Sequence, residues 1–516
     1  MASRERLAEQ IARNGVPFVF GIPGSGLSLE LLDALERRGV PFHLCHFEGS
    51  AAMMAATVGH LTGRAGVAIS IKGPGLVNLL PGLALAHFEG FPLVAIAEAY
   101  GVNTPPAVAH KRLDQSSLVA AVAKGVRGHA DTGPSFAELA SWAEAQEPGP
   151  VLLELRAGPD APQDPIPLGP ATVVTSGAEA VAERVGRSER PVVIAGALAV
   201  RLGLGATLES LSVPVLTSVA AKGLVDERRF PSAGVFTGAG GPLAPETVIL
   251  RKADLVIGIG LQPKELLKTA PFSCAALDLG VGAPPGWEAF GLEMRAAPDA
   301  LPMVIDALAG KRWGQELAMD AIAALDARLC QGFLPGAVFR ALARILPSHT
   351  RLVMDTGSFC TVGEHVWKAP AASLSLLSAQ GRYMGTGLPM GVAASLVDPE
   401  RPTVTVVGDG GIGMYLSEVR LAIQAKAPLL LVLMTDGAFA SIRTRALKDG
   451  LTQRPLRMTG GPWVPALEGL GMPGRYIRDE TDLFDALTAW DPSGGPLFLE
   501  VAFDADRYEA MVHGVR

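Results

Sequence analysis

Two Asp-Gly pairs end two apolar segments in the last third of the chain. Asp409 lies within Gly408–Gly411, directly after the apolar residues 403–407, and Asp436 follows the apolar residues 429–435, 27 residues later. This spacing is typical of one strand-helix-strand unit, so both carboxylates are expected at the carboxyl edge of one parallel sheet. Carboxylates suit a hard cation such as Mg2+, and backbone amides at a helix start suit a phosphate. Together the pairs predict a metal and phosphate site, although either alone could mark an ordinary loop.

A single glutamate, Glu48, stands between the apolar residues 42–46 and a strongly apolar helical pattern. The dipole of a helix favours an acid in its first turn, so an exposed structural role is one interpretation. The other is a buried acid that keeps its proton, which apolar neighbours favour.

A glycine-rich turn follows the next apolar segment, residues 66–71. The turn has the sequence KGPG over residues 72–75 and leads through Asn78 into another apolar helical pattern. Gly-Pro-Gly turns are common in loops, so the turn indicates little without the motifs around it.

Taken together, these motifs resemble the thiamine-diphosphate-dependent enzymes of the acetolactate synthase and benzoylformate decarboxylase type. The resemblance spans nearly the whole chain, and it differs from the usual motif in having Thr435-Asp436 where Asn-Asn is common. It implies thiamine diphosphate and Mg2+ as cofactors and a 2-oxo acid as the substrate that loses carbon dioxide. The resulting enamine is then either protonated to an aldehyde or ligated to a second carbonyl, as in acetolactate synthase.

The same resemblance implies roles for individual residues. Glu48 would donate to the aminopyrimidine ring nitrogen of the cofactor, and so activate it. The metal ligands would be the Asp409 and Asp436 side chains and the Ala438 carbonyl. Met384 would wedge beneath the two rings of the cofactor, although a core methionine is a common alternative. The other cofactor contacts would come from Gly73, Asn78, Thr356, Gly357, Ser358, Gly408, Gly410, Gly411 and Phe439.

Three further residues are candidates for contact with the substrate. Ser25 matches a serine that contacts the substrate carboxylate in benzoylformate decarboxylase, and a plain turn role is its alternative. His110 lies in the region where related decarboxylases carry a His-His pair, which this chain lacks. Lys72 replaces a small polar residue, so it either adds a cation for an acidic substrate or reaches solvent. The segment 441–463, rich in arginine, is a candidate lid over the cleft.

Apolar segments of strand length alternate with helical patterns along the chain, which predicts an α/β fold with parallel sheets. Three series of strands predict three consecutive α/β domains: a pyrimidine-binding domain at 1–165, a central domain at 171–312 and a diphosphate- and Mg2+-binding domain at 330–516. A Gly/Pro-rich stretch at 158–170 is the expected first linker. The expected strands are residues 18–21, 42–46, 66–71, 93–97 and 151–155, then 191–195, 213–217, 255–259 and 276–278, then 352–355, 403–407, 429–435 and 497–501.

Composition argues against several classes of protein. Hydrophobic residues make up 49% of the 516 residues, but no apolar run approaches the roughly 18 to 20 residues of a membrane span. The net charge of -7, with dispersed Lys and Arg, argues against a nucleic-acid partner. Four widely spaced cysteines and the lack of a signal-peptide pattern predict a cytoplasmic location.

The resemblance also bears on assembly and on alternatives. It implies a homodimer or homotetramer in which Glu48 of one subunit serves a cofactor held by another. The central domain resembles the flavin-carrying domain of acetolactate synthase, but residues 258–260 form only part of a dinucleotide motif, so FAD is not expected to be required. A non-catalytic relative that binds the cofactor without turnover is the alternative function. A nicotinamide dehydrogenase would fit the GxGxxG at 408–413, but Asp409 would repel a pyrophosphate there.

Overall fold

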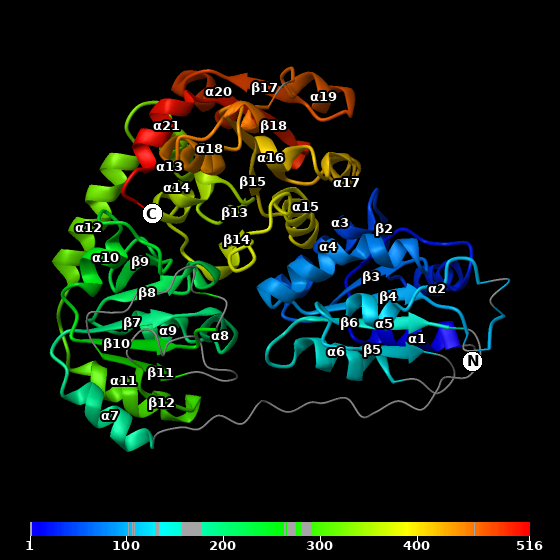
Figure 1. The fold of residues 1–516 in the computed structure, drawn as a ribbon, viewed down its shortest axis with the longest axis horizontal. Coiled ribbons are helices and arrows are strands. Elements are labelled where there is room, and N and C mark those ends of the chain that lie inside the picture. Colours follow the sequence, from blue (N-terminus) through cyan, green and yellow to red (C-terminus); the bar gives the residue numbers. More distant parts are fainter. Residues whose placement is uncertain are drawn as a thin grey trace.

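Three six-stranded sheets follow one another along the chain, and every strand pair within them is parallel (Figure 1). The computed structural model describes residues 3–156, 177–262, 265, 275–279, 292–458 and 460–515, apart from residues 102, 106, 108 and 130–133. The predicted fold class, three α/β domains with parallel sheets, is confirmed. We call them the first, middle and third domains, each defined by its sheet. Their predicted boundaries stay predictions, and the expected linker at 158–170 lies outside the described residues.

The first sheet has the strand order β2-β1-β3-β4-β6-β5. Its strands are β1 (Val19–Gly21), β2 (Phe42–Leu44), β3 (Gly66–Ser70), β4 (Leu93–Glu98), β5 (Val126–His129) and β6 (Pro150–Leu155). Its helices are α1 (Ser3–Arg13), α2 (Leu27–Glu36), α3 (Glu48–Thr62), α4 (Pro74–Glu89), α5 (Gln115–Val119) and α6 (Phe136–Glu144). The apolar side chains of α1, α2 and α6 cover one face of this sheet, and those of α3 and α4 cover the other.

The middle sheet has the order β12-β11-β10-β7-β8-β9. Its strands are β7 (Pro191–Ala195), β8 (Val215–Ser218), β9 (Ser232–Phe236), β10 (Leu255–Ile259), β11 (Ala275–Leu279) and β12 (Leu292–Ala296). The helices of this region are α7 (Ala178–Gly186), α8 (Ala197–Arg201), α9 (Gly205–Glu209), α10 (Pro245–Leu250), α11 (Leu301–Ala309) and α12 (Gln315–Leu329). The last of them, α12, packs on the middle sheet through α10 and β9 and on the third domain through α14.

The third sheet has the order β14-β13-β15-β16-β18-β17. Its strands are β13 (Arg351–Met354), β14 (Ser375–Leu377), β15 (Thr403–Gly408), β16 (Leu429–Thr435), β17 (Gly474–Ile477) and β18 (Leu497–Ala502). Its helices are α13 (Pro335–Ile345), α14 (Ser358–Val366), α15 (Gly387–Val397), α16 (Asp409–Ile412), α17 (Val419–Gln424), α18 (Ala440–Lys448), α19 (Val464–Gly469), α20 (Glu480–Ala489) and α21 (Ala505–Val512). Strands β15 and β16 are almost wholly buried, as helices on both faces of a parallel sheet require.

The first and third domains share one apolar core. Met53 and Ala56 of α3 belong to the same buried cluster as Met390 and Ala393 of α15. Figure 1 shows α15 and α17 of the third domain turned towards α3 and α4 of the first. This shared core accounts for part of the high apolar content of the chain. Among the described helices, none combines the length and the apolar character needed to cross a bilayer.

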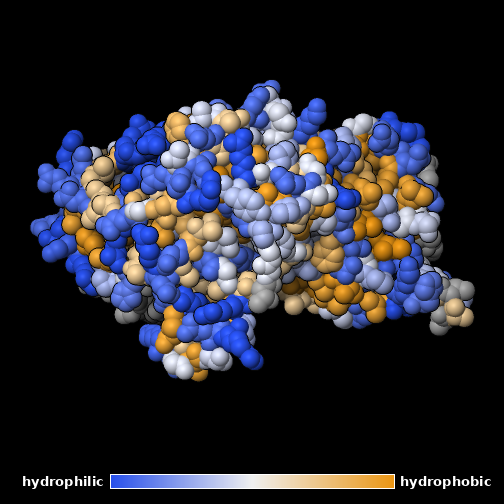
Figure 2. All heavy atoms as spheres, turned by 90° about the horizontal axis from the view of Figure 1, so that it is seen from above, coloured by the Kyte–Doolittle hydropathy of each residue, from blue (hydrophilic) through white to orange (hydrophobic). Residues whose placement is uncertain are grey.

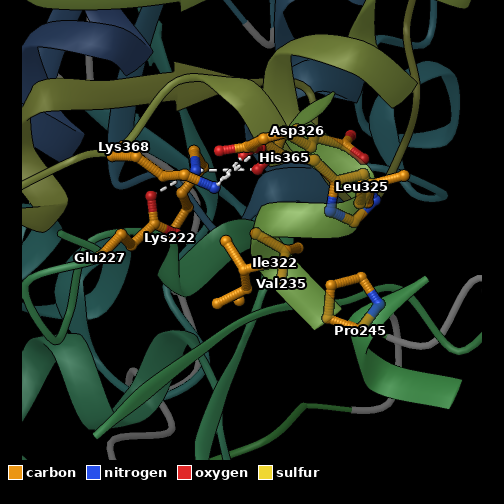
Figure 3. A pocket seen from close by; sticks show the side chains of 11 residues that line it. Lys222, Glu227, Val235, Pro245, Ile322, Leu325, Asp326, His365 and Lys368 are labelled. Carbon is orange, nitrogen blue, oxygen red and sulfur yellow. Dashed lines mark hydrogen bonds and ion pairs between the residues drawn. The ribbon is translucent and has the colours of Figure 1, made fainter. Parts of the chain in front are cut away.

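A buried ion pair of the middle domain contacts the third domain at their junction (Figure 3). Lys222, 2% exposed, pairs with Glu227 and donates to the Glu364 carbonyl at 2.9 Å. Lys368 lies beside it and contacts Asp326 at 3.3 Å. The cavity at this junction measures about 10 Å³, which is room for a single water. These charges therefore tie two domains together and leave no space for a substrate.

Candidate active site

The carboxyl edge of the third sheet collects most of the predicted cofactor residues. Strands β13 and β15 are neighbours in this sheet. The chain continues from β13 to β14 on one side and from β15 to β16 on the other. Ligands of open α/β sheets bind outside the carboxyl ends of the strands at such a switch point. Asp355 follows β13 and Asp409 follows β15, so an acid stands on each side of this switch point.

Asp409 and Asp436 lie next to each other at this edge. The Asp409 carboxylate accepts from the Thr435 hydroxyl at 2.5 Å and from the Asp436 amide at 2.9 Å. Burial, together with the charge of Asp409, raises the pKa of Asp436 to about 6. The structure thus brings the two predicted metal acids together in an arrangement that a bound cation would relieve. Ala438, the third predicted ligand, donates its amide to Asp436 at 3.1 Å.

Met384 and Phe439 flank the glycines that follow Asp409. A methyl group added to Gly410 would lie 2.5 Å from the Phe439 ring and 2.8 Å from the Met384 sulfur. A side chain at Gly411 would collide with the Asp355 carboxylate. Glycines are therefore required by close packing here, and Met384 lies where the predicted cofactor residues converge.

Asp355 precedes the predicted residues 356–358 but was given no role of its own, although it follows β13 just as Asp409 follows β15. Its carboxylate accepts from the Thr356 amide at 2.8 Å and from the Gly385 amide at 2.8 Å. Burial raises its pKa to about 7. The contact ties the predicted residues Thr356, Gly357 and Ser358, at the start of α14, to the loop that carries Met384. Ser358 also lines one small pocket with Asp436.

Glu48 occupies the carboxyl edge of the first sheet, as the first residue of α3. Its side chain is 7% exposed, so the interpretation as an exposed helix acid is wrong. Asn78 donates to the Glu48 carboxylate at 3.0 Å. Gly73 caps α4 with φ +66°, a conformation that favours glycine. The two motifs predicted separately, Glu48 and the turn before Asn78, therefore meet in one site.

Ser25 and His110 lie close to the carboxyl edge of the first sheet, but their surroundings support a role less directly than those of Glu48 do. Ser25 is exposed, on a loop whose neighbouring glycines pack on Glu98. His110 is exposed too, beside Lys111, whose carbonyl packs against Gly73. Lys72 does not simply reach solvent, because it forms an ion pair with the buried Glu98.

Glu418 of the third domain holds the loop that presents Glu48. It belongs to the short helix η7 (Leu416–Glu418) and is fully buried. Its carboxylate accepts from the His46 amide at 3.0 Å, the Phe47 amide at 3.2 Å and the Ser50 hydroxyl at 2.6 Å. The position of Glu48 therefore depends on a residue of another domain.

Glu89, at the end of α4 in the first domain, in turn holds a segment of the third domain. Its buried carboxylate accepts from the Ser378 hydroxyl at 2.8 Å and from the amides of residues 379–381 at 2.8 to 3.1 Å. This segment leads directly to Met384. Neither Glu89 nor Glu418 has a local motif that would identify it, so sequence reasoning missed both.

The candidate lid lies along the residues that follow Asp436. The Phe439 amide donates to the Leu456 carbonyl at 3.0 Å, and the Met458 amide donates to the Gly437 carbonyl at 2.8 Å. Arg443 pairs with Asp506 at 2.5 Å and lines the small pocket beside Asp436.

Comparison with known proteins accounts for this arrangement. Residues 1–118 match the N-terminal TPP binding domain of thiamine pyrophosphate enzymes, residues 178–276 match their central domain, and residues 355–501 match their C-terminal TPP binding domain. The chain belongs to the thiamine pyrophosphate enzyme family. The two cofactor-binding domains of this thiamine pyrophosphate (thiamine diphosphate) enzyme are the first and third domains, which share an apolar core. Glu89 of the first domain binds the third domain, and Glu418 of the third domain binds the first.

The relatives of this thiamine pyrophosphate enzyme are of the acetolactate synthase type. It is 26% identical to a catabolic acetolactate synthase of Raoultella terrigena, over 96% of this chain and 94% of the relative. It is 27% identical to a probable 2-ketoarginine decarboxylase of Pseudomonas aeruginosa, over 94% and 90%. It is 24% identical to an acetolactate synthase of Bacillus subtilis, over 97% and 93%.

Proposed function

We propose that the chain decarboxylates a 2-oxo acid with thiamine diphosphate and Mg2+, with Glu48 as its essential acid. The observation that carries the proposal is the buried Glu48 carboxylate, oriented by Asn78 at the start of α3. In this position Glu48 can share a proton with a ring nitrogen of the aminopyrimidine. Asn78 fixes the Glu48 side chain, and Glu418 fixes the loop that carries Glu48.

Bound thiamine diphosphate supplies the electron sink for the reaction. The bond between C1 and C2 of the acid breaks and carbon dioxide leaves. The electron pair left at C2 is then taken up by a proton, which yields an aldehyde, or by the carbonyl carbon of a second molecule. The relatives named as acetolactate synthases and as a decarboxylase favour the shared first step.

The residues at the edge of the third sheet fit a diphosphate held through Mg2+. This ion is usually bound by one or two carboxylates together with phosphate oxygens. Asp409 and Asp436 match that set, and the described residues contain no group of three acids, histidines or cysteines that would suit a dedicated metal cage. The Ala438 carbonyl would complete the protein ligands. Gly408, Gly410, Gly411 and residues 356–358 would face the diphosphate.

In the middle domain, the Glu265 carboxylate occupies the carboxyl edge of the sheet, the position that corresponds to the candidate diphosphate site of the third domain. Glu265 accepts from the Ala197 amide at 2.8 Å, beyond β7, and from the Gln262 amide at 2.5 Å, beyond β10. These strands flank the switch point of this sheet. A dinucleotide phosphate would compete with that carboxylate, which supports the prediction that FAD is not required.

We further propose that copies of the chain associate through the first domain. Helix α4 has sixteen residues, and Glu89 is its only acid or strong base. Val77 and Phe88 on its outer side are 40% and 41% exposed. In Figure 2, apolar side chains gather on the right, over the first domain. A helix this apolar is normally covered on all sides, so a second copy is the natural cover.

The decisive experiment is carbon dioxide release from a panel of 2-oxo acids with added thiamine diphosphate and Mg2+. Glu48→Gln should lower the release by about 100-fold or more, the usual contribution of a positioned acid. Glu144→Gln is the matched control, since Glu144 accepts from the Ala65 amide at the opposite edge of the same sheet. Release that survives in Glu48→Gln contradicts the proposal. Cofactor binding without release from any acid would favour the non-catalytic alternative.

A further inference from the structure

A second cavity opens on the carboxyl edge of the first sheet, beyond the residues assigned to the cofactor. It measures about 220 Å³. Pockets for drug-sized ligands run from about 300 to 1,000 Å³, so this cavity suits one end of a small molecule. Four of its lining residues are cationic, namely Lys72, Lys111, Arg112 and Arg156.

Two of the four cations are neutralised by acids of the same edge. Lys72 pairs with Glu98, and Arg156 pairs with Glu154. The Glu98 carboxylate is further occupied by the Ser28 amide at 2.9 Å. These pairs fix the base of the cavity and contribute no net charge to it.

The other two cations keep their charge available. Arg112 donates to the Thr104 carbonyl at 2.9 Å and lies over the Tyr100 ring, 5.6 Å from its centre. Neither Lys111 nor Arg112 forms an ion pair with any acid in the described part of the chain. The cavity therefore carries about two uncompensated positive charges, which would attract an anion.

One turn separates this cavity from Glu48. On one side, a methyl group added to Gly75 would lie 3.4 Å from the Glu48 carboxylate. On the other side, Gly73 packs against the backbone of Lys111, and its amide donates to Gln115, another lining residue, at 3.2 Å. Glu48 follows β2 and Gly73 follows β3, and these two strands are two strand spacings apart, about 10 Å. A donor whose reacting end lies at a cofactor held by Glu48 can thus extend its other end towards the cavity.

We infer that this cavity binds a second acidic group on the donor substrate, so that the preferred donor is a short dicarboxylic 2-oxo acid. The inference rests on the proposed function and narrows its substrate class. Lys111 and Arg112 would contact the distant carboxylate, while Lys72 and Arg156 shape the site through their acid partners. A 2-oxo acid with a cationic end would be rejected by like charge.

The test compares two donors that differ in one group. 2-Oxoglutarate carries a distant carboxylate, and 2-oxoglutaramate carries a neutral amide of the same shape. The wild type should prefer the acid by about tenfold or more in kcat/KM, and Lys111→Gln or Arg112→Gln should each lower that ratio by about tenfold, which corresponds to one lost charged contact. Arg13→Gln, which removes an exposed cation of α1 on the same domain, should keep the wild-type ratio.

Failure of the inference and failure of the proposed function give different results. Glu48-dependent release with equal rates for acid and amide, or a ratio that neither variant changes, overturns the inference alone. If no 2-oxo acid is turned over, the proposed function fails, and calorimetric binding of glutarate to the protein loaded with thiamine diphosphate and Mg2+ still decides the inference. Tenfold weaker glutarate binding in Lys111→Gln supports it, and equal binding overturns it.

Discussion

Ser50 and Glu418 are 368 residues apart in the chain, and their side chains meet at 2.6 Å where the first domain packs on the third. The same carboxylate holds the amides of the two residues that precede Glu48. A contact between distant domains therefore positions the residue on which the proposed reaction depends.

Ser50→Ala should lower both stability and activity. A hydrogen bond to a charged group contributes about 1.5 to 3 kcal/mol, so the thermal midpoint of the cofactor-loaded enzyme should fall. The Glu48 loop loses one of its ties, so kcat should fall as well. Ser395→Ala is the control, because the Ser395 hydroxyl is buried and donates to the Val392 carbonyl within α15. A Ser50→Ala enzyme with wild-type midpoint and kcat would show that the contact is dispensable.

Asp409→Asn and Asp436→Asn should raise the Mg2+ concentration that half-activates the enzyme. Each change removes a negative charge from the predicted metal site, and we expect an increase of about tenfold or more. The measurement is a Mg2+ titration of activity after treatment with a chelator. Asp398→Asn, which removes an acid paired with Arg401 elsewhere in the third domain, should follow the wild-type titration. A wild-type enzyme indifferent to the chelator would remove the basis for this site.

Gly73→Ala should disable the turn that carries Asn78 to Glu48. An alanine at the Gly73 backbone angles, φ +66° and ψ -108°, is strained by more than the roughly 1 to 2 kcal/mol of a left-handed α residue, and its methyl group would also collide with the Lys111 carbonyl. Gly63→Ala is the positive-φ control, since Gly63 has φ +70° and ψ +10°, in the left-handed region, with no neighbour within 4 Å of an added methyl group. Both variants should lose stability in urea unfolding, but only Gly73→Ala should lose kcat. Equal kcat in the two variants would argue against a role for the turn.

The fold was predictable from the sequence wherever a strand is covered on both faces. All interior strands of the three sheets were predicted, because such strands consist of continuous apolar runs, as β16 does. The five strands that were missed, β5, β9, β12, β14 and β17, all lie at a sheet edge. In β17, for example, Arg475 and Tyr476 are exposed, so no apolar run marks it. Edge strands are held by one neighbour only, and their sequences are correspondingly less apolar.

The candidate site was predictable to the extent that its residues belong to local motifs. Glu48, Asp409 and Asp436 stand beside glycines or strand ends at fixed spacing. Glu89 and Glu418 act through backbone amides of a distant segment, and no spacing along the chain reveals such a partner. Their burial could not be inferred either, since an acid within a helix is usually exposed.

Glu265→Gln should remove a pH dependence of stability. Burial raises the pKa of Glu265 from 4.5 to about 7, so the folded protein binds this proton more tightly than the unfolded chain does. The free energy of unfolding should therefore fall as the pH rises from about 4.5 through about 7, by about 3 kcal/mol from this group. Urea unfolding of wild type and variant across this range measures the difference. Parallel curves would show that folding does not shift the pKa of Glu265.

The core shared by the first and third domains also sets an order of events during translation. Helix α3 leaves the ribosome some 325 residues before α15, the helix that covers it. At about 5 to 20 residues per second, the apolar side of α3 waits roughly 15 to 60 s for its partner. During that time the nascent chain exposes Met53 and its neighbours, and a chaperone that shields them would be expected to raise the yield. The site around Glu48 can close only after the middle domain has been made in full.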